Sequence, residues 1–188
     1  MRATFAFFRQ AAMHWRETGA IAPSGPILAK AMAKAVGPLP PGEIIIELGP
    51  GSGVFTKELM RRYPANPVLA VEFNPVFVRS LQRDLPAAIV VEGCASQLTT
   101  LLAQAGLSAD RVGAVVSGLP LLILPPALVA NILRSITEVL PAGRPFVQFT
   151  YSKRRWQRFN PRGFQAQPSK RVWLNVPPAV ILPFTRAG

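Results

Sequence analysis

Short runs of β-branched and apolar residues alternate, from residue 44 onward, with segments in which apolar residues recur every three or four positions. The runs are typical of strands buried on both faces, and the periodic segments are typical of helices that cover a sheet. The alternation predicts an α/β sheet that is parallel and doubly wound, with right-handed crossovers and an antiparallel pairing among its last strands. The predicted strands occupy 44–48, 68–73, 88–92, 113–116, 145–151, 172–176 and 180–184, and the helices between them 54–62, 75–84, 97–105 and 126–140.

Two helices are predicted before the sheet, one over residues 5–17 and one over 26–36, so the chain divides into an N-terminal helical part, 1–36, and a main domain, 37–188. The first helix carries an aromatic face flanked by arginines. This pattern is typical of a helix that lies in a membrane interface, although a helix packed on the domain's own surface would show it too. The side chains expected to meet lipid here are Phe5, Phe8, Arg9, Trp15 and Arg16.

The chain is strongly basic, with 21 Lys and Arg against 9 Asp and Glu and a formal net charge of +12. Such a charge predicts an anionic partner, either nucleic acid or an acidic membrane surface, and does not choose between them. No acid occurs after Tyr151, where the positive charges include Lys153, Arg154 and Arg155. These three residues are expected to contact phosphates at an interface; a solvated surface loop is the alternative.

One cysteine, Cys94, rules out an internal disulfide and fits a reducing compartment. The only histidine, His14, is far from it in sequence, and neither has the paired spacing of a zinc site, so no metal is expected. The first thirty residues contain no apolar run long enough for a signal core or a membrane span. The expected location is therefore the cytoplasm.

The first strand ends in an acid and then in three alternating glycines, Glu47-Leu48-Gly49-Pro50-Gly51-Ser52-Gly53. Glycines in a turn between a strand and a helix let the backbone approach a ligand closely, and the first N–H groups of the helix then face that ligand. The spacing differs from the dinucleotide fingerprint G-x-G-x-x-G. The turn therefore predicts a nucleoside site, with an ordinary strand-to-helix loop as the alternative.

A second acid, Glu72, ends the second strand nineteen residues after Gly53. An acid at this place accepts hydrogen bonds from ribose hydroxyls in nucleotide-binding sheets. The loop from Ser117 to Leu122 follows the fourth strand, and ligands of open sheets bind beyond the carboxyl ends of the strands. We therefore expect this loop to lie beside the glycine turn and to face the reacting atoms.

These motifs resemble the class I S-adenosylmethionine-dependent methyltransferases over about residues 41–188, which implies a seven-stranded Rossmann-like sheet with helices on both faces. The turn at 47–53 and the segment 71–74 are similar to a branch that contains ribosomal RNA adenine dimethylases and bacterial phospholipid N-methyltransferases. Segments 19–24, 117–121 and 147–151 are more similar to the lipid enzymes. The resemblance implies a cofactor site formed by Glu47, Gly49, Gly51, Ser52, Gly53, Glu72, Phe73, Cys94, Ala95 and Ser117.

Two positions depart from the patterns of these families. Where the family usually has Gly-Asp-Ala after the third strand, with the Asp on the adenine amino group, this chain has Gly93-Cys94-Ala95. Cysteine is a poor acceptor, so adenine recognition would depend on the backbone or on Ser96 or Gln97. The adenine-methylating enzymes have an aromatic residue where this chain has Leu121, and a leucine cannot stack on an extruded base as a ring does.

The resemblance implies N-methylation of phosphatidylethanolamine by S-adenosyl-L-methionine, in one or more steps toward phosphatidylcholine, with S-adenosyl-L-homocysteine as product. Ser117, Leu119, Pro120 and Tyr151 are the candidate catalytic residues. The expected protein is a monomer peripheral on the inner face of the bacterial cytoplasmic membrane, acting on lipid and not on nucleic acid. The alternatives are an RNA or DNA adenine N-methyltransferase and a non-catalytic lipid-binding module with a vestigial cofactor site.

Overall fold

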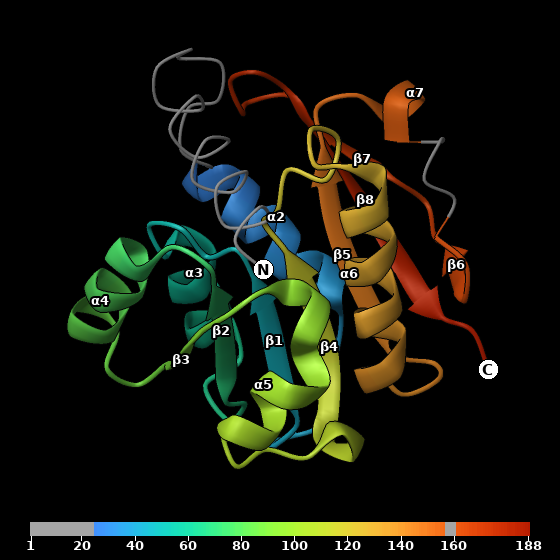
Figure 1. The fold of residues 1–188 in the computed structure, drawn as a ribbon. Coiled ribbons are helices and arrows are strands. Elements are labelled where there is room, and N and C mark those ends of the chain that lie inside the picture. The colour runs from blue at the N-terminus through green and yellow to red at the C-terminus, as the bar shows by residue number, and fades with distance from the viewer. Residues whose placement is uncertain (1–24, 157–160) are drawn as a thin grey trace.

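A single mixed sheet forms the centre of the computed structural model, which describes residues 25–156 and 161–188 (Figure 1). The strands follow the order β3-β2-β1-β4-β5-β8-β6, and β7 also pairs with β8. Strands β1 to β5 are parallel to one another and β8 is antiparallel to β5, which confirms the predicted α/β architecture. The bounds are β1 Ile44–Leu48, β2 Val68–Glu72, β3 Ile89–Glu92, β4 Val112–Ser117, β5 Pro145–Thr150, β6 Phe164–Ala166, β7 Lys170–Val172 and β8 Ala179–Arg186.

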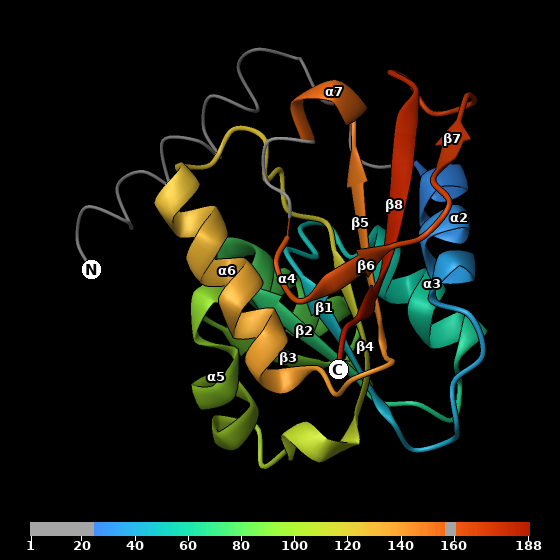
Figure 2. The ribbon, with the colours of Figure 1, turned by 90° about the vertical axis from the view of Figure 1, so that its right-hand side faces the viewer.

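Helices cover both faces of the sheet, and Figure 2 shows the sheet between these two layers. One layer contains α2 and α3, with α4 against β2 and β3, and the other contains α5 and α6. A one-turn helix, α7, follows β5. The bounds are α2 Pro26–Val36, α3 Val54–Arg62, α4 Pro75–Asp84, α5 Leu98–Gln104, α6 Pro126–Val139 and α7 Lys153–Trp156, with 3₁₀ turns at Ala95–Gln97 and Ala109–Arg111.

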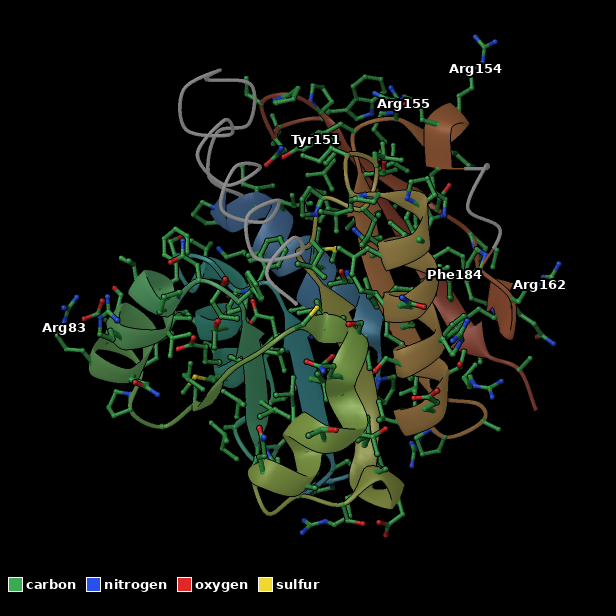
Figure 3. All side chains as sticks on the ribbon, in the orientation of Figure 1. Arg83, Tyr151, Arg154, Arg155, Arg162 and Phe184 are labelled. Carbon is green, nitrogen blue, oxygen red and sulfur yellow. The ribbon has the colours of Figure 1, made fainter. Side chains whose placement is uncertain are left out.

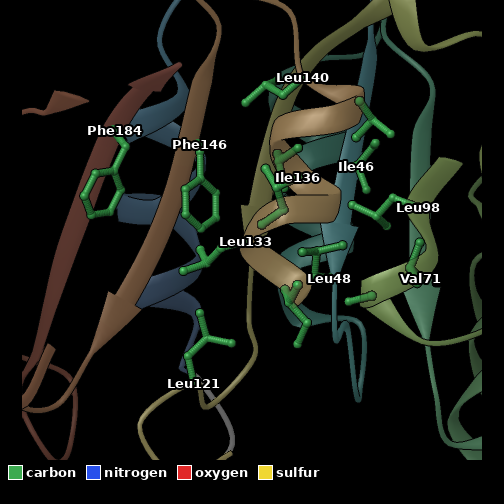
Figure 4. Packing of buried hydrophobic residues seen from close by; sticks show 14 of the residues in the cluster. Ile46, Leu48, Val71, Leu98, Leu121, Leu133, Ile136, Leu140, Phe146 and Phe184 are labelled. Atoms are coloured by element: carbon green, nitrogen blue, oxygen red, sulfur yellow. The ribbon is translucent and has the colours of Figure 1, made fainter. Parts of the chain in front are cut away.

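Every residue of β1 is buried, and its side chains alternate between two hydrophobic cores because successive residues of a strand point to opposite faces. Ile46 and Leu48 pack on the α5/α6 side, and Figure 4 shows them beside residues of α6 and β5. Ile45 packs on the α2/α3 side. The same alternation places the acid of this strand, Glu47, on the α2/α3 face.

The predicted strand over 172–176 is wrong, because only Val172 of that range belongs to a strand. The edge next to β8 is formed instead by β6 and β7, which pair with successive parts of the same strand on either side of an interruption at residues 167–169. Residues 173–178 form a loop from β7 to β8. Their β-branched and aromatic content suggests a strand, but Pro177 and Pro178 have no N–H group to donate to a ladder.

The segment after β5 forms a short helix, α7, and not the solvated loop that was the alternative for its basic residues. Trp156, which follows Lys153, Arg154 and Arg155, is only 5% exposed. Its ring centroid lies 6.0 Å from that of Phe184 in β8. Trp156 therefore fixes α7 to the sheet as a core residue, while the three cations before it remain exposed.

The predicted helix over residues 5–17 lies outside the described residues. The predicted division of the chain after residue 36 therefore stays a prediction. The second predicted helix is present as α2, with Gly25 as its N-cap and Pro26 at its first position. Within the described residues, no helix has the length and apolar character needed to span a bilayer.

Candidate active site

The turn between β1 and α3 holds its three glycines in left-handed backbone conformations, with φ values of 68° at Gly49, 55° at Gly51 and 80° at Gly53. The turn closes through a 2.9 Å hydrogen bond from the Gly53 N–H to the Pro50 carbonyl. A left-handed conformation costs roughly 1–2 kcal/mol for an ordinary L-residue and very little for glycine. The alternating glycines of the sequence are therefore explained by backbone geometry.

The three glycines differ in what surrounds them. A Cβ on Gly49 would lie 2.6 Å from the side chain of Leu119, and one on Gly53 would lie 2.8 Å from that of Leu81. A Cβ on Gly51 would meet nothing within 4 Å. The outer two glycines therefore allow close packing of the protein on itself, and the middle one faces open space at the start of α3, where a ligand can approach the backbone.

Glu72 connects this turn to the end of β2. Its carboxylate accepts hydrogen bonds from the Gly51 N–H at 3.0 Å and from the Asn74 N–H at 2.8 Å. Burial raises the pKa of Glu72, and the backbone hydrogen bonds, with one from Phe73 besides these two, offset only part of that rise. The structure thus brings together the second acid and the glycine turn, as the sequence predicted.

Glu47 lies under the turn and is fully buried. Burial raises its pKa from 4.5 to about 8; a contact with Thr56 lowers it, and the negative charge of Glu72 raises it further. Neither carboxylate oxygen has a hydrogen-bond partner with acceptable geometry among the described residues. A buried carboxyl group without a partner is costly, and a cation placed beside it would favour its charged form.

The loop after β4 is fixed against β1, as predicted. The Gly118 N–H donates to the Leu48 carbonyl at 2.8 Å, and a Cβ on Gly118 would lie only 2.8 Å from the carbonyl oxygen of Gly49. Ser117 is fully buried, and its hydroxyl accepts a hydrogen bond from the Leu119 N–H at 3.3 Å. This loop therefore touches the glycine turn directly, with Pro120 half-buried beyond it.

Gln148 is a residue of this region that the sequence pattern did not single out. It is buried in β5, and its Nε2 donates to the carbonyls of Leu119 at 3.0 Å and Phe149 at 2.7 Å. The available signal was an amide between apolar residues of a buried strand, since such a group must find partners inside the protein. Gln148 positions the backbone of the loop after β4.

Tyr151 follows β5 on the face that also holds Glu47, whereas the alternation of β4 places Ser117 on the α5/α6 face. The Tyr151 ring packs edge-to-face against Phe149 with centroids 5.5 Å apart. Burial raises the pKa of Tyr151, and its contact with Asn175 lowers it in part. The two polar candidates for catalysis therefore lie at one edge of the sheet on opposite faces, with Tyr151 protonated at neutral pH.

The segment after β3 lies beside Glu72, because the Gly93 N–H donates to the Glu72 carbonyl at 2.9 Å. The Sγ of Cys94 lies 3.1 Å from the Oγ of Ser96, and a hydrogen bond joins them. Ala95 is buried in the core on the α5/α6 side. Where the sequence resemblance implies an aspartate, this chain therefore has a thiol and hydroxyl pair.

The predicted lipid-binding residues divide into two groups. Lys153, Arg154 and Arg155 are exposed on α7, and Figure 3 shows the two arginines at the same end of the molecule as Tyr151. Phe5, Phe8, Arg9, Trp15 and Arg16 lie outside the described residues. No group of three or more His, Cys, Asp or Glu residues in the described ranges could hold a metal ion.

Comparison with curated proteins finds a relative over almost the whole chain. An ornithine lipid N-methyltransferase of Singulisphaera acidiphila is 31% identical over 183 residues, which is 95% of this chain and 94% of the relative. The chain belongs to the class I S-adenosylmethionine-dependent methyltransferases. No model of a known protein family matches it.

Solved structures agree with the fold of this methyltransferase. TrmN from Thermus thermophilus superposes with a TM-score of 0.71 at 18% identity, over 86% of this chain and 48% of its own. A TehB-like SAM-dependent methyltransferase from Corynebacterium glutamicum superposes with a TM-score of 0.64 at 16% identity, over 99% of this chain and 100% of its own. The methyltransferase therefore spans about half of TrmN and all of the TehB-like protein.

S-Adenosyl-L-methionine is the cofactor of this methyltransferase, and the described residues fit it. It carries a sulfonium and an ammonium group, and the buried, unpartnered carboxyl of Glu47 would be stabilised as a carboxylate by a nearby positive charge. The open space at Gly51 admits a ligand to the backbone, and Glu72 lies at the strand end where ribose hydroxyls are held in such sheets. The cofactor supplies an activated methyl group, and the protein supplies binding and alignment.

We expect Gly51→Ala to reduce cofactor affinity by about tenfold or more while the protein stays folded, because its methyl group would occupy the open space of the turn. Gly106→Ala is the matched control: Gly106 has φ 67° and also meets nothing within 4 Å, but it is far from the site in the turn after α5. Both variants should lose about 1 kcal/mol of stability. Calorimetry with S-adenosylhomocysteine and thermal unfolding measure the two effects; equal affinities would contradict the placement of the cofactor.

A second prediction concerns pH and Glu47. Between pH 4.5 and about 8 the folded protein keeps a proton on Glu47 that the unfolded chain releases, so this group makes the free energy of unfolding fall as pH rises. The slope is about 1.4 kcal/mol per pH unit within this window. Glu47→Gln should remove that contribution, as measured by urea unfolding at a series of pH values.

The same group should link cofactor binding to proton release. A cation beside Glu47 favours the ionised form, so the affinity for S-adenosylmethionine should rise with pH up to about 8 and should become flatter in Glu47→Gln. Variant and wild type with the same pH dependence would show that no cofactor charge lies near this carboxyl.

Proposed function

We propose that this methyltransferase transfers a methyl group from S-adenosylmethionine to the primary amine of a membrane lipid. The observation that carries the proposal is its likeness, over almost the full length of both chains, to a protein named as an ornithine lipid N-methyltransferase. Phosphatidylethanolamine and ornithine lipid share the relevant chemistry, because each presents a primary amine together with an anionic group. The substrate class is therefore a lipid with a primary amine beside an anionic group, and transfer assays with the two lipids distinguish its two members.

The site would act mainly by alignment. The transferred methyl group is already activated in the sulfonium, so the protein has to hold the amine in line with it and exclude water. The Tyr151 hydroxyl is a candidate to orient the amine nitrogen. A primary ammonium has a reference pKa of roughly 10.4, and Tyr151 is itself protonated at neutral pH, so water or the anionic group of the lipid would accept the proton.

Exposed cations near Tyr151 would receive the anionic group of the lipid. Lys153, Arg154 and Arg155 lie on α7, directly after β5, and each cation near an anionic surface contributes on the order of 1 kcal/mol to membrane binding. We place the protein at the cytoplasmic face of a membrane as part of this proposal.

The adenine-methylating alternative has the net charge of +12 in its favour. The loop after β4 argues against it, because Leu121, where those enzymes have a stacking aromatic residue, is 2% exposed and packs in the core (Figure 4). An extruded base therefore finds no stacking partner at this position.

Transfer of labelled methyl groups from S-adenosylmethionine tests the proposal directly. Vesicles that contain phosphatidylethanolamine or ornithine lipid are the two substrate arms, phosphatidylcholine vesicles are the blank, and RNA and DNA are the competing arms. We expect label in at least one amine lipid. Label in nucleic acid alone would support the alternative of an adenine N-methyltransferase. Absence of S-adenosylhomocysteine binding would indicate a non-catalytic protein.

Tyr151→Phe should lower the rate of transfer about tenfold while cofactor affinity is unchanged, since the ring keeps its packing on Phe149 and only the hydroxyl is lost. Tyr63→Phe is the matched control. The Tyr63 hydroxyl donates to backbone carbonyls of Ala33 and Gly37 away from the site, so its loss should lower stability and leave the transfer rate unchanged. Equal rates in the two variants would remove Tyr151 from the mechanism.

A further inference from the structure

The loop from β7 to β8, residues 173–178, exposes large apolar side chains. Trp173 is 69% exposed, Leu174 77% and Val176 79%, while Asn175 between them is 6% exposed. The loop is anchored through the buried Asn175 side chain, whose Nδ2 donates within the loop to the Pro177 carbonyl at 2.7 Å. The anchor holds the three apolar side chains outward as a group, and such a patch on a protein surface marks an interaction site.

The loop lies at the end of the sheet that carries the active site. Thr150, at the carboxyl end of β5, pairs with Val180 near the start of β8. The loop before β8 therefore lies beyond the carboxyl ends of the parallel strands, as the glycine turn does. Figure 2 shows β7, β8 and α7 reaching this end of the molecule together. The Asn175 side chain also contacts Tyr151, the candidate that would orient the substrate amine.

The start of α2 borders the same loop. A Cβ placed on Gly25 would lie 3.6 Å from the Oδ1 of Asn175. Ile27, in the first turn of α2, is 45% exposed. The first turn of α2 therefore adds an exposed apolar side chain close to the β7–β8 loop.

Cations border this apolar loop. Lys170 and Arg171 precede it in β7, and the Lys153 side chain of α7 donates to Ser169, directly before β7, at 2.9 Å. The guanidinium carbon of Arg171 lies 4.8 Å from the centroid of the Trp173 ring, in a cation–π contact. Aromatic and aliphatic side chains surrounded by Lys and Arg match the boundary between lipid headgroups and acyl chains.

The charge pattern also separates a membrane from a second copy of the chain as the occupant. No acid occurs between Tyr151 and Gly188, while eight Lys and Arg residues do. Two copies joined through their β7–β8 loops would bring these like charges together, which opposes association. An anionic lipid surface instead complements the cations and accepts the apolar side chains.

We propose that the β7–β8 loop inserts Trp173, Leu174 and Val176 into the membrane that holds the substrate, and so brings the edge of the sheet to the lipid headgroups. The inference rests on the proposed function for its choice of a lipid partner. It adds a membrane anchor in the C-terminal part of the chain that is independent of the predicted N-terminal helix.

The test compares the full-length wild type with the variant Trp173→Ser/Leu174→Ser/Val176→Ser in flotation with vesicles of phosphatidylethanolamine and phosphatidylglycerol. We expect partitioning to fall by about tenfold or more. Cofactor affinity and methylation of lipid dispersed in detergent micelles should be unchanged, because Asn175 is retained. Val76→Ser is the control. Val76 is 61% exposed in the first turn of α4, which packs on β3 and β2 at the other end of the strand order from β8.

Depth of insertion is measured by quenching of tryptophan fluorescence with lipids brominated in their acyl chains. The chain has two other tryptophans, Trp15 and Trp156, so the comparison is made in a Trp15→Phe background. There Trp173→Phe should remove most of the quenching, because Trp156 is buried in the core. Quenching that is equal with and without Trp173 in this background would overturn the proposal.

The outcomes separate the loop from the proposed function. Normal vesicle binding by the triple variant would contradict membrane insertion by the loop and leave the proposed lipid substrate unaffected. Loop-dependent vesicle binding by a protein that methylates no lipid would support the loop and contradict the proposed function. Loss of activity on micellar lipid in the triple variant would contradict membrane insertion and indicate that the loop binds the lipid headgroup. A wild-type dimer that becomes a monomer in the triple variant would contradict it too and indicate a contact between subunits.

Discussion

The carboxylate of Glu72 connects the two backbone segments on which the active site depends. It accepts one hydrogen bond from the glycine turn after β1 and one from the segment that opens α4 after β2. Hydrogen bonds to a charged group contribute about 1.5–3 kcal/mol each, and the parallel pairing of β1 with β2 brings the partners to one edge of the sheet. The open space at Gly51 exists because this carboxylate and the close packing of the outer glycines fix the turn around it.

Glu47 gives the site its electrostatic character. Its strand position places the carboxyl on the α2/α3 face, where burial raises the pKa to about 8 and the contact with Thr56 offsets only part of that rise. Such an arrangement costs stability in the free protein, and a cationic cofactor would recover part of that cost on binding. A costly buried group of this kind is typical of a functional site.

The sequence predicted the central part of the fold because strands β1, β2, β4 and β5 are buried on both faces and therefore appear as continuous apolar runs, as does the partly buried edge strand β3. It also predicted the contact of the glycine turn with Glu72 and with the loop after β4, since the carboxyl ends of neighbouring parallel strands meet. The strands and buried residues at the C-terminal edge of the sheet could not be predicted from apolar runs in this way. Trp156 and Trp173 both stand among basic residues, yet only the fold shows that the first is in the core and the second in solvent.

The same limit applies to single side chains of the site. Gln148 gains its importance from a contact with Leu119, 29 positions away, which no local pattern reveals. Cys94 departs from the aspartate that the sequence resemblance implies, and the structure adds that Ser96 lies beside it. Ser117, one of the candidate catalytic residues, is fully buried and its hydroxyl accepts a hydrogen bond from its own loop, which favours a positioning role.

The central claim is that this methyltransferase modifies the amine of a membrane lipid. It is tested most directly by mass spectrometry of total lipids from a bacterial host that makes phosphatidylethanolamine but no methylated lipid. A second culture of the same host is engineered to make ornithine lipid as well. Expression of the chain should produce amine lipids heavier by whole methyl groups, with fragments that place the added mass on the headgroup nitrogen. An unchanged lipid profile in cells that contain folded, cofactor-binding protein would contradict the account.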